Sequence, residues 1–194
     1  MSTGRLFVVV GPSGVGKDSL MREAVRLRPD LHLVRRVITR PEAAGGEDFE
    51  GVSEPEFAAR LSHGDFVLHW RAHGLSYGVP KAVRAVLDAG QDAVLNGSRA
   101  VLRETQEAFP NLVVIHVTAQ PRVLAERLAA RGRESADDIA RRLKRAAMPL
   151  PEGLNKVVEI DNSGDFASGV QALLDALRPL GAKPGDIRYE PQDA

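Results

Sequence analysis

A glycine-rich loop directly after a short apolar run is the feature of this sequence that most constrains its fold. The apolar run covers residues 6–10, and the loop reads Gly-Pro-Ser-Gly-Val-Gly-Lys-Asp-Ser over residues 11–19. Apolar residues at helical spacing follow from Leu20 to Val25. A buried strand, a glycine-rich turn and a helix in this order are typical of a phosphate-binding P-loop. The pattern therefore predicts an α/β protein with a nucleoside-triphosphate site.

The residue types in the loop suit a polyphosphate. Glycines let the backbone curl so that several N–H groups point into one concavity, and the following helix adds the positive end of its dipole. Lys17 brings a full positive charge to the β- and γ-phosphates, so we expect it to be catalytic. The residues expected to bind the ATP phosphates are Gly11, Pro12, Ser13, Gly14, Val15, Gly16, Lys17, Asp18 and Ser19.

The residue after the lysine departs from the usual P-loop pattern. Ser or Thr is typical there, because its hydroxyl binds Mg²⁺. This chain has Asp18 instead, with Ser19 one position later. An anionic side chain beside phosphates is costly unless a cation lies between them, so Asp18 predicts a bound Mg²⁺. Whether Asp18 or Ser19 binds the metal directly is left open.

Composition limits the classes of protein to which the chain can belong. Its 194 residues fit one α/β domain with an insertion or a lid. The 26 Lys and Arg residues balance 26 Asp and Glu residues, so nucleic acid and anionic membranes are not expected partners. No cysteine is present, which excludes disulfides and thiolate metal sites. No apolar stretch has the length of a signal peptide or a membrane span, so a cytoplasmic protein is expected.

Apolar periodicity and breaker residues predict alternating strands and helices. The predicted strands cover residues 6–10, 31–39, 66–70, 93–97, 112–117 and 156–160, with a loop over 40–48 and a turn over 74–80. The predicted helices cover residues 16–28, 53–64, 81–89, 99–109, 121–130, 136–148 and 166–177, with Ser53 as an N-cap. This alternation predicts a mostly parallel five-stranded sheet with helices on both faces.

The whole chain, residues 1–194, is predicted to form a single P-loop kinase domain. Residues 31–81 are expected to form a small acceptor-binding insertion, and residues 127–148 an arginine-bearing lid. The tail over residues 179–194 is rich in Pro, Gly and charge, so we expect it to be mobile and to contribute little to the core.

Two stretches of the insertion carry side chains suited to an acceptor. Arg36 and Arg40 can pair with a phosphate in a two-pronged fashion, although both could also be solvated charges at a strand end. Tyr77 follows Gly74 and precedes a second glycine, and its hydroxyl could reach an acceptor phosphate. His73 is a possible general base, but a lone histidine beside a glycine is more often structural.

Arginines gather around a glycine between the last two helices before residue 148. Arg131, Arg133 and Arg142 are the candidates for a catalytic role, because a lid that closes over ATP can place positive charge on the transferring group. A solvated basic helix is the alternative. Arg145 fits a surface charge equally well.

The P-loop and the Thr-Arg, Gly-Glu, Tyr-Gly and Arg-Gly-x-Glu stretches occur in an order that resembles the guanylate-kinase group. The chain is more similar still to the ribose 1,5-bisphosphate phosphokinases of phosphonate metabolism. Six motifs carry that closer resemblance: Gly-Lys-Asp-Ser at 16–19, Arg-Val-Ile-Thr-Arg-Pro at 36–41, Gly-Gly-Glu-Asp at 45–48, the stretch from Trp70 to Pro80, Asn-Gly-Ser-Arg at 96–99 and Arg-Gly-Arg-Glu at 131–134. That resemblance implies transfer of the ATP γ-phosphate, with Mg²⁺, to the 1-phosphate of ribose 1,5-bisphosphate, giving 5-phosphoribosyl 1-diphosphate and ADP. The acceptor-binding residues expected under it are Arg36, Thr39, Arg40, Glu47, Tyr77 and Arg99.

Departures from the guanylate-kinase pattern bear on the acceptor. Leu68 falls where guanylate kinases carry the acidic residue that reads the guanine edge, and Asn96 begins the run that replaces an expected aspartate. Both losses argue against nucleobase recognition. Two alternatives stay open: a guanylate or other nucleoside-monophosphate kinase, and a non-catalytic guanylate-kinase-like binding module. The second is disfavoured because such a module should lose Lys17 and the lid arginines. The oligomeric state is not predicted.

Overall fold

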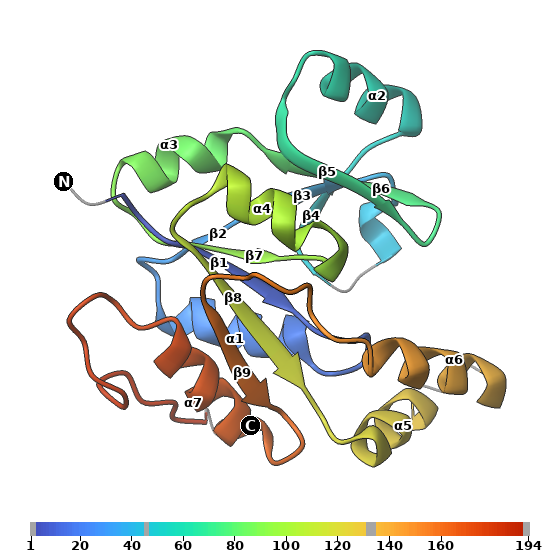
Figure 1. The fold of residues 1–194 in the computed structure, drawn as a ribbon, viewed down its shortest axis with the longest axis vertical. Helices are drawn as coiled ribbons and strands as arrows, with labels where there is room; N and C mark the ends of the chain where they lie inside the picture. Colours follow the sequence, from blue (N-terminus) through green and yellow to red (C-terminus); the bar gives the residue numbers. More distant parts are fainter. Residues whose placement is uncertain (1–2, 45–46, 131–134, 192–194) are drawn as a thin grey trace. The chain divides into compact units, whose positions relative to one another are not determined.

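The computed structural model describes residues 3–44, 47–130 and 135–191. Five strands form one sheet in the order β2-β7-β1-β8-β9 (Figure 1). They are β1 (Leu6–Val10), β2 (His32–Leu33), β7 (Ala93–Asn96), β8 (Leu112–Thr118) and β9 (Val157–Asp161). The pairs β2–β7 and β8–β9 are parallel. The predicted five-stranded α/β architecture is confirmed.

The chain divides into two compact units. One contains the residues up to 8 together with 30–112, and the other contains 9–29 together with the residues from 113 onward. The P-loop and the predicted lid belong to the second unit. The candidate acceptor-binding residues belong to the first.

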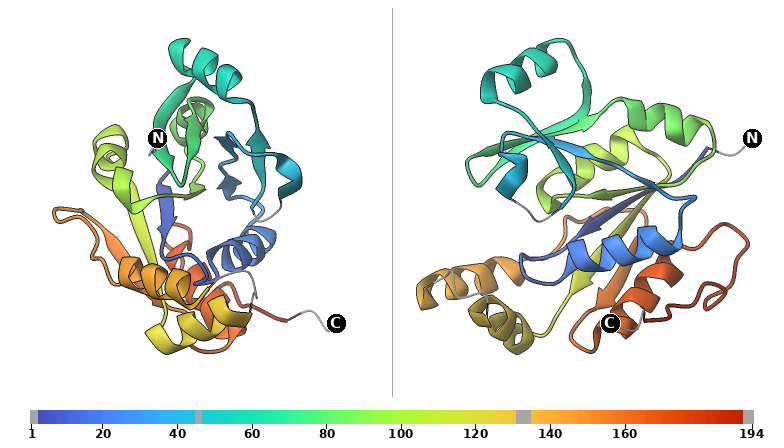
Figure 2. Two further views of the ribbon diagram at one scale, coloured as in Figure 1. Left: turned by 90° about the vertical axis from the view of Figure 1, so that its right-hand side faces the viewer. Right: turned by 180° about the vertical axis from the view of Figure 1, so that it is seen from behind.

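The first unit contains a second, mixed sheet in the order β4-β3-β6-β5. Its strands are β3 (Arg36–Ile38), β4 (Phe49–Gly51), β5 (Phe66–Ala72) and β6 (Leu75–Pro80), and β3 pairs with β4 in parallel and with β6 antiparallel. Strands β5 and β6 form an antiparallel hairpin, which Figure 2 shows from two further sides. Phe57 of α2 (Glu54–Ser62) stacks on Phe66 with ring centroids 4.8 Å apart, next to buried Val37.

Two predicted elements of this unit are wrong. The single strand over 31–39 is two strands, β2 and β3, which belong to different sheets. Residues 74–80 are not a turn: Leu75–Pro80 form strand β6, and the turn is limited to His73 and Gly74, whose φ angles are 52° and 76°. Positive φ at both central residues is the requirement of a two-residue hairpin turn of type I′. The glycine at 78 is a packing feature, because a Cβ there would lie 2.6 Å from the Phe66 ring.

Helices of the first unit follow the expected boundaries closely. Ser53 caps α2 as predicted, since its Oγ accepts a hydrogen bond from the Glu56 N–H at 3.3 Å. The remaining helical segments are η1 (Glu42–Ala44), α3 (Ala82–Asp88), η2 (Arg99–Val101) and α4 (Leu102–Ala108). The predicted helix over 99–109 is therefore a 3₁₀ turn followed by an α-helix.

The second unit contains α1 (Lys17–Leu27), α5 (Pro121–Ala130), α6 (Ala136–Ala146) and α7 (Phe166–Ala176). Helix α7 packs against α1 and β9, and α5 packs against α6 (Figure 1). The buried Arg28 at the end of α1 donates from Nη1 to the Leu177 carbonyl at 2.5 Å. No helix within the described ranges has the length and apolar character needed to span a membrane.

Candidate active site

The glycine loop between β1 and α1 has the backbone that a phosphate site requires. Gly14 and Gly16 adopt left-handed φ angles of 88° and 98°, which other residues rarely tolerate. Gly11 lies against β8, where a Cβ would be 2.3 Å from the Val117 carbonyl oxygen. Gly16 is the N-cap of α1 and makes no side-chain cap. The free N–H groups of a helix N-terminus attract anions.

Two side chains from distant parts of the chain hold this loop at Val15. Asn162, directly after β9, donates from Nδ2 to the Val15 carbonyl at 2.7 Å, and Arg127 of α5 donates to the same oxygen at 3.4 Å. Asn162 is buried, and its amide fills the space where a Cβ at Gly16 or Gly169 would clash, at 2.8 and 2.3 Å. These two side chains therefore fix the backbone of the loop at Val15.

Lys17 is the first residue of α1, and its ammonium group lies over the loop. Its Nζ donates to the carbonyl oxygens of Gly11 at 3.0 Å and Pro12 at 3.3 Å. These contacts hold the charge within the loop. An incoming phosphate offers oxygen acceptors of higher charge, so the ammonium group is placed to pair with them.

Asp18 and Ser19 follow in the first turn of α1, and both side chains are exposed. Carboxylate and hydroxyl oxygens are ligands that Mg²⁺ accepts, and Mg²⁺ at nucleotide sites commonly takes only one or two protein ligands beside phosphates and water. The donor set at the start of α1 therefore fits this metal. Among the described residues, no three His, Cys, Asp or Glu side chains converge into a metal-binding group.

A pocket of about 560 Å³ adjoins the glycine loop within the second unit. It is lined by Gly14, Gly16, Ser19, Arg22, Glu23, Arg127, Ala130, Asn162 and Phe166. Phe166, the first residue of α7, contributes an aromatic ring that is 43% exposed. A pocket of this volume with polar groups and one exposed ring is suited to a nucleoside.

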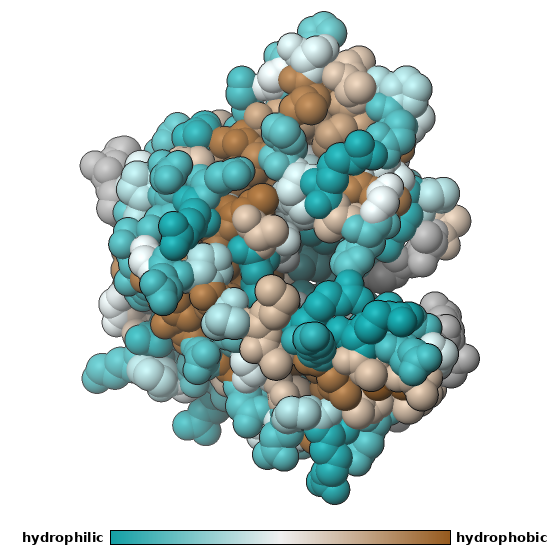
Figure 3. Space-filling model, turned by 45° about the vertical axis from the view of Figure 1, so that its right-hand side comes forward, coloured by the Kyte–Doolittle hydropathy of each residue, from teal (hydrophilic) through white to brown (hydrophobic). Residues whose placement is uncertain are grey.

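One of the three predicted lid arginines contacts the loop. Arg142 of α6 donates from Nη1 to the Ser13 hydroxyl at 2.6 Å. Arg131 and Arg133 lie outside the described residues. Helix α6 has no buried residue. Figure 3 shows a group of hydrophilic side chains next to a more apolar band at the lower right of the molecule.

A capping box sets the start of α6. Ser135 accepts from the Asp138 N–H, and the Asp138 carboxylate accepts from both the Ser135 hydroxyl and N–H. These bonds, with Arg141, lower the pKa of Asp138 to about 2. The folded-state pKa is depressed, so the cap is intact at neutral pH and is lost only as the pH falls towards that value.

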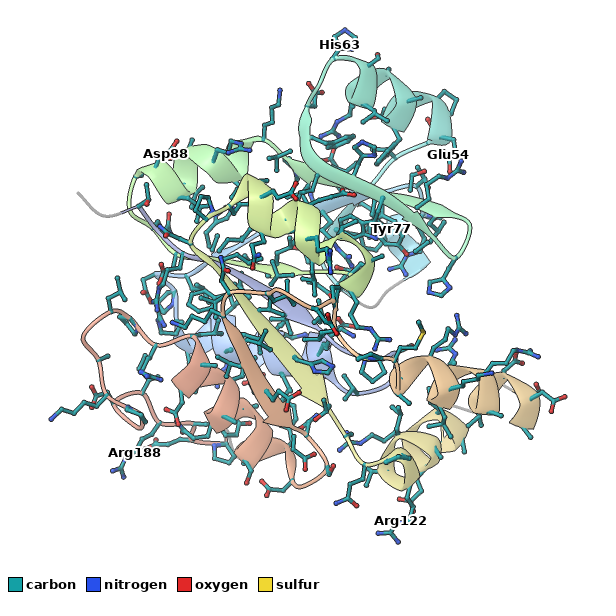
Figure 4. All side chains as sticks on the ribbon, viewed as in Figure 1. Glu54, His63, Tyr77, Asp88, Arg122 and Arg188 are labelled. Atoms are coloured by element: carbon teal, nitrogen blue, oxygen red, sulfur yellow. The ribbon has the colours of Figure 1, made fainter. Side chains whose placement is uncertain are left out.

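In the first unit, the buried Arg36 and the partly buried Glu47 form an ion pair. Arg36 Nε donates to Glu47 Oε2 at 3.0 Å, and Nη2 donates to Oε1. The Arg36 guanidinium also lies over the rings of Trp70 and Tyr77, at 5.6 and 5.1 Å, and these two rings stack on each other. Tyr77 is labelled in Figure 4, on β6. Two expected acceptor-binding residues are thus each other's partners.

The other three acceptor candidates have different surroundings. The Thr39 hydroxyl accepts from the Ser76 N–H at 2.8 Å and so links β3 to β6. The Arg40 guanidinium lies 4.4 Å from the centroid of the Phe49 ring. Arg99 begins η2, and partial burial lowers the pKa of its guanidinium. His73 is exposed at the tip of the hairpin, where its positive φ serves the turn.

Sequence patterns did not indicate Asn162 or Phe166 as parts of the site, and Arg127 was included only as the first residue of the predicted lid. A polar residue directly after a strand was the available signal for Asn162, because ligands gather at the carboxyl ends of parallel strands. Phe166 carries no local signal, since it reaches the pocket through the packing of its helix.

The family model described as Guanylate kinase matches residues 3–177. The chain belongs to the guanylate kinase family. A solved member with a similar fold is the guanylate kinase from Anaplasma phagocytophilum, with a TM-score of 0.66, 21% identity, and coverage of 91% of this chain and 85% of that one. At that identity the likeness concerns the fold alone.

Within the guanylate kinase family, the chain groups with ribose 1,5-bisphosphate phosphokinases. It is 51% identical over 178 residues to the ribose 1,5-bisphosphate phosphokinase PhnN of Ruegeria sp. (strain TM1040), covering 90% of this chain and 94% of the relative. It is 46% identical over 187 residues to a bifunctional ribose 1,5-bisphosphokinase-thymidine phosphorylase of Cupriavidus pinatubonensis (strain JMP 134 / LMG 1197). That match covers 95% of this chain and 31% of the longer relative.

Proposed function

We propose that this protein is a ribose 1,5-bisphosphate phosphokinase. It transfers the γ-phosphoryl group of ATP to the 1-phosphate of ribose 1,5-bisphosphate, forming 5-phosphoribosyl 1-diphosphate and ADP. The observation that carries the proposal is the 51% identity to a protein of that name over 94% of its length. The P-loop geometry of the second unit supports it independently.

The ATP side of the reaction uses the glycine loop, α1 and the adjoining pocket. Backbone N–H groups and the α1 N-terminus hold the phosphates, and the Lys17 ammonium pairs with the β- and γ-phosphate oxygens. The pocket beside the loop takes the base and ribose. Arg142, together with Arg131 and Arg133, supplies further positive charge to the transferring group.

The acceptor side uses the first unit. Arg40 and Arg99 pair with the acceptor phosphates. Arg36, which is paired with Glu47, packs over the Tyr77 ring and holds that side chain in place. The attacking atom is an oxygen of a phosphate that is already ionised, so no strong general base is required. Catalysis is therefore positioning and charge neutralisation.

Bound Mg²⁺ neutralises the triphosphate and orients its terminal oxygens. We propose that Asp18 helps to hold the metal, and we predict that Asp18→Asn raises the Mg²⁺ concentration for half-maximal rate by about tenfold. The change keeps the shape of the side chain and removes its charge. Titration of the initial rate with Mg²⁺ at fixed ATP measures the effect.

Asp18→Ser is the matched variant, because it installs the residue usual in P-loops. It should lie between the wild type and Asp18→Asn in its Mg²⁺ requirement. An unchanged Mg²⁺ dependence in Asp18→Asn would remove the assignment of Asp18 as a metal ligand.

Acceptor selectivity tests the proposed function directly. With Mg-ATP, ribose 1,5-bisphosphate should support ADP formation at least about 100-fold faster than GMP, as measured by kcat/KM in a coupled ADP assay. Leu68 of β5 is buried and apolar, so it offers no acceptor to the N–H groups of guanine.

Each alternative gives a different result in the same assay. A nucleoside-monophosphate kinase would prefer GMP or another monophosphate to the ribose compound. A non-catalytic module would form no ADP with any acceptor.

A further inference from the structure

The C-terminal tail lies beyond residues 3–177, which the guanylate kinase family model matches, and is held on α7 by specific bonds. The Gln171 amide donates to the Ile187 carbonyl and accepts from the Tyr189 N–H, both at 2.9 Å. Asp175 accepts from the Gly185 N–H at 2.8 Å. The side-chain amide of a glutamine can both donate to a backbone carbonyl and accept from a backbone N–H. Gln171 therefore binds the tail backbone through the same two kinds of hydrogen bond that a neighbouring strand makes. The described part of the tail runs beside α7 in Figure 1.

The hydrogen bonds from α7 to the tail backbone set the direction of the side chains at the end of the tail. Arg188 is exposed and points away from α7 (Figure 4). Tyr189 is half-buried, and its ring meets the Phe166 ring edge to face, with centroids 6.2 Å apart and planes at 88°. Edge-to-face contact is a favoured arrangement of aromatic pairs.

Phe166 connects the tail to the pocket beside the glycine loop. It is the first residue of α7, a position where a helix is least constrained by its own hydrogen bonds. Phe166 lines the pocket and is 43% exposed, so part of the residue is accessible to a ligand. A ring at such a position binds a base well only when its orientation is held by another contact.

We infer that the tail is part of the nucleotide site: Tyr189 is a positioning residue that holds Phe166 in the orientation that contacts the base of ATP. The inference rests on the proposed function, in which this pocket receives the nucleoside portion of ATP. Under this inference, residues beyond 177, which the family model does not match, contribute to nucleotide affinity.

The test compares Tyr189→Ala with two controls in the full chain. Tyr189→Phe keeps the ring that meets Phe166, and Arg188→Ala changes the adjacent, outward-facing residue. Tyr189→Ala should raise the Kd for ADP in calorimetry and the KM for ATP by about 3- to 10-fold. Complete loss of base–aromatic stacking weakens binding by about 5- to 150-fold, and Tyr189→Ala leaves the Phe166 ring in place but less well held, so only part of that effect is expected. The kcat, the KM for the acceptor and the affinity for inorganic tripolyphosphate, which has no base, should be unchanged. Both controls should match the wild type.

A second variant, Gln171→Leu, releases the tail without touching either ring, and it should reproduce the Tyr189→Ala pattern. Unchanged ADP affinity in Tyr189→Ala and Gln171→Leu overturns the inference. Equal losses of ADP and tripolyphosphate affinity also overturn it, because they indicate a general structural effect. If the wild type binds tripolyphosphate but not ADP, the nucleotide pocket itself is wrong, and the proposed function fails with it.

Discussion

Lys17→Ala is expected to lower kcat/KM by about 10³-fold or more, the largest effect on activity that the structure predicts. The Lys17 ammonium lies over the phosphate loop, where it donates to the carbonyl oxygens of Gly11 and Pro12. Its proposed role in the transition state is to neutralise charge that develops on the β- and γ-phosphate oxygens. No other described lysine lies in the loop or the first turn of α1.

The measurement is steady-state ADP release with ribose 1,5-bisphosphate and Mg-ATP, together with thermal unfolding to confirm that the variant is folded. Arg122→Ala is the matched control, because it removes a positive charge from an exposed site at the start of α5 (Figure 4). That control should keep wild-type kinetics. A Lys17→Ala variant with wild-type turnover would refute the P-loop assignment.

The second large effect concerns stability. Glu47→Ala is expected to lower the free energy of unfolding by about 2–4 kcal/mol, because it leaves the Arg36 guanidinium buried without its carboxylate. The side chains of Arg36 and Glu47 are 7% and 18% exposed, so solvent screens their interaction weakly. The Arg36 guanidinium also lies over Trp70 and Tyr77, whose packing should loosen with it.

Urea denaturation measures this loss, and the next residue along the chain supplies the control. Asp48 also forms an ion pair, with Arg35 at 2.9 Å, but the side chains are 68% and 49% exposed. Asp48→Ala should therefore change the free energy of unfolding by less than about 0.5 kcal/mol. Equal effects of Glu47→Ala and Asp48→Ala would show that burial does not strengthen the Arg36–Glu47 pair.

The parts of the protein that sequence reasoning predicted correctly are local. The P-loop is nine consecutive residues, and its glycines, lysine and following helix each reflect short-range backbone requirements. The Ser53 cap is also local, since its bond joins residues three positions apart. Apolar runs were sufficient to predict β1 and β8, because the side chains of these two strands are buried along almost their whole length.

The two wrong secondary-structure predictions concern segments whose structure depends on the strand or side chain that packs against them. Residues 31–39 look like one strand, yet His32 pairs with Ala93 in one sheet and Arg36 pairs with Phe49 in the other. Strand β6 was interpreted as a turn because it contains Gly78 and ends in Pro80, although Gly78 is there to accommodate Phe66. Breaker residues mark a turn only when no neighbouring side chain requires their small size.

The sequence by itself determined that a triphosphate loop opens an α/β chain, because consecutive residues set the backbone of that loop. Only the tertiary structure decided what surrounds it. Asn162 reaches the Val15 carbonyl from 147 positions away, and Tyr189 meets Phe166 because the tail folds back along α7. Such contacts depend on how helices and strands pack, and packing is a property of the whole core rather than of any short stretch of sequence.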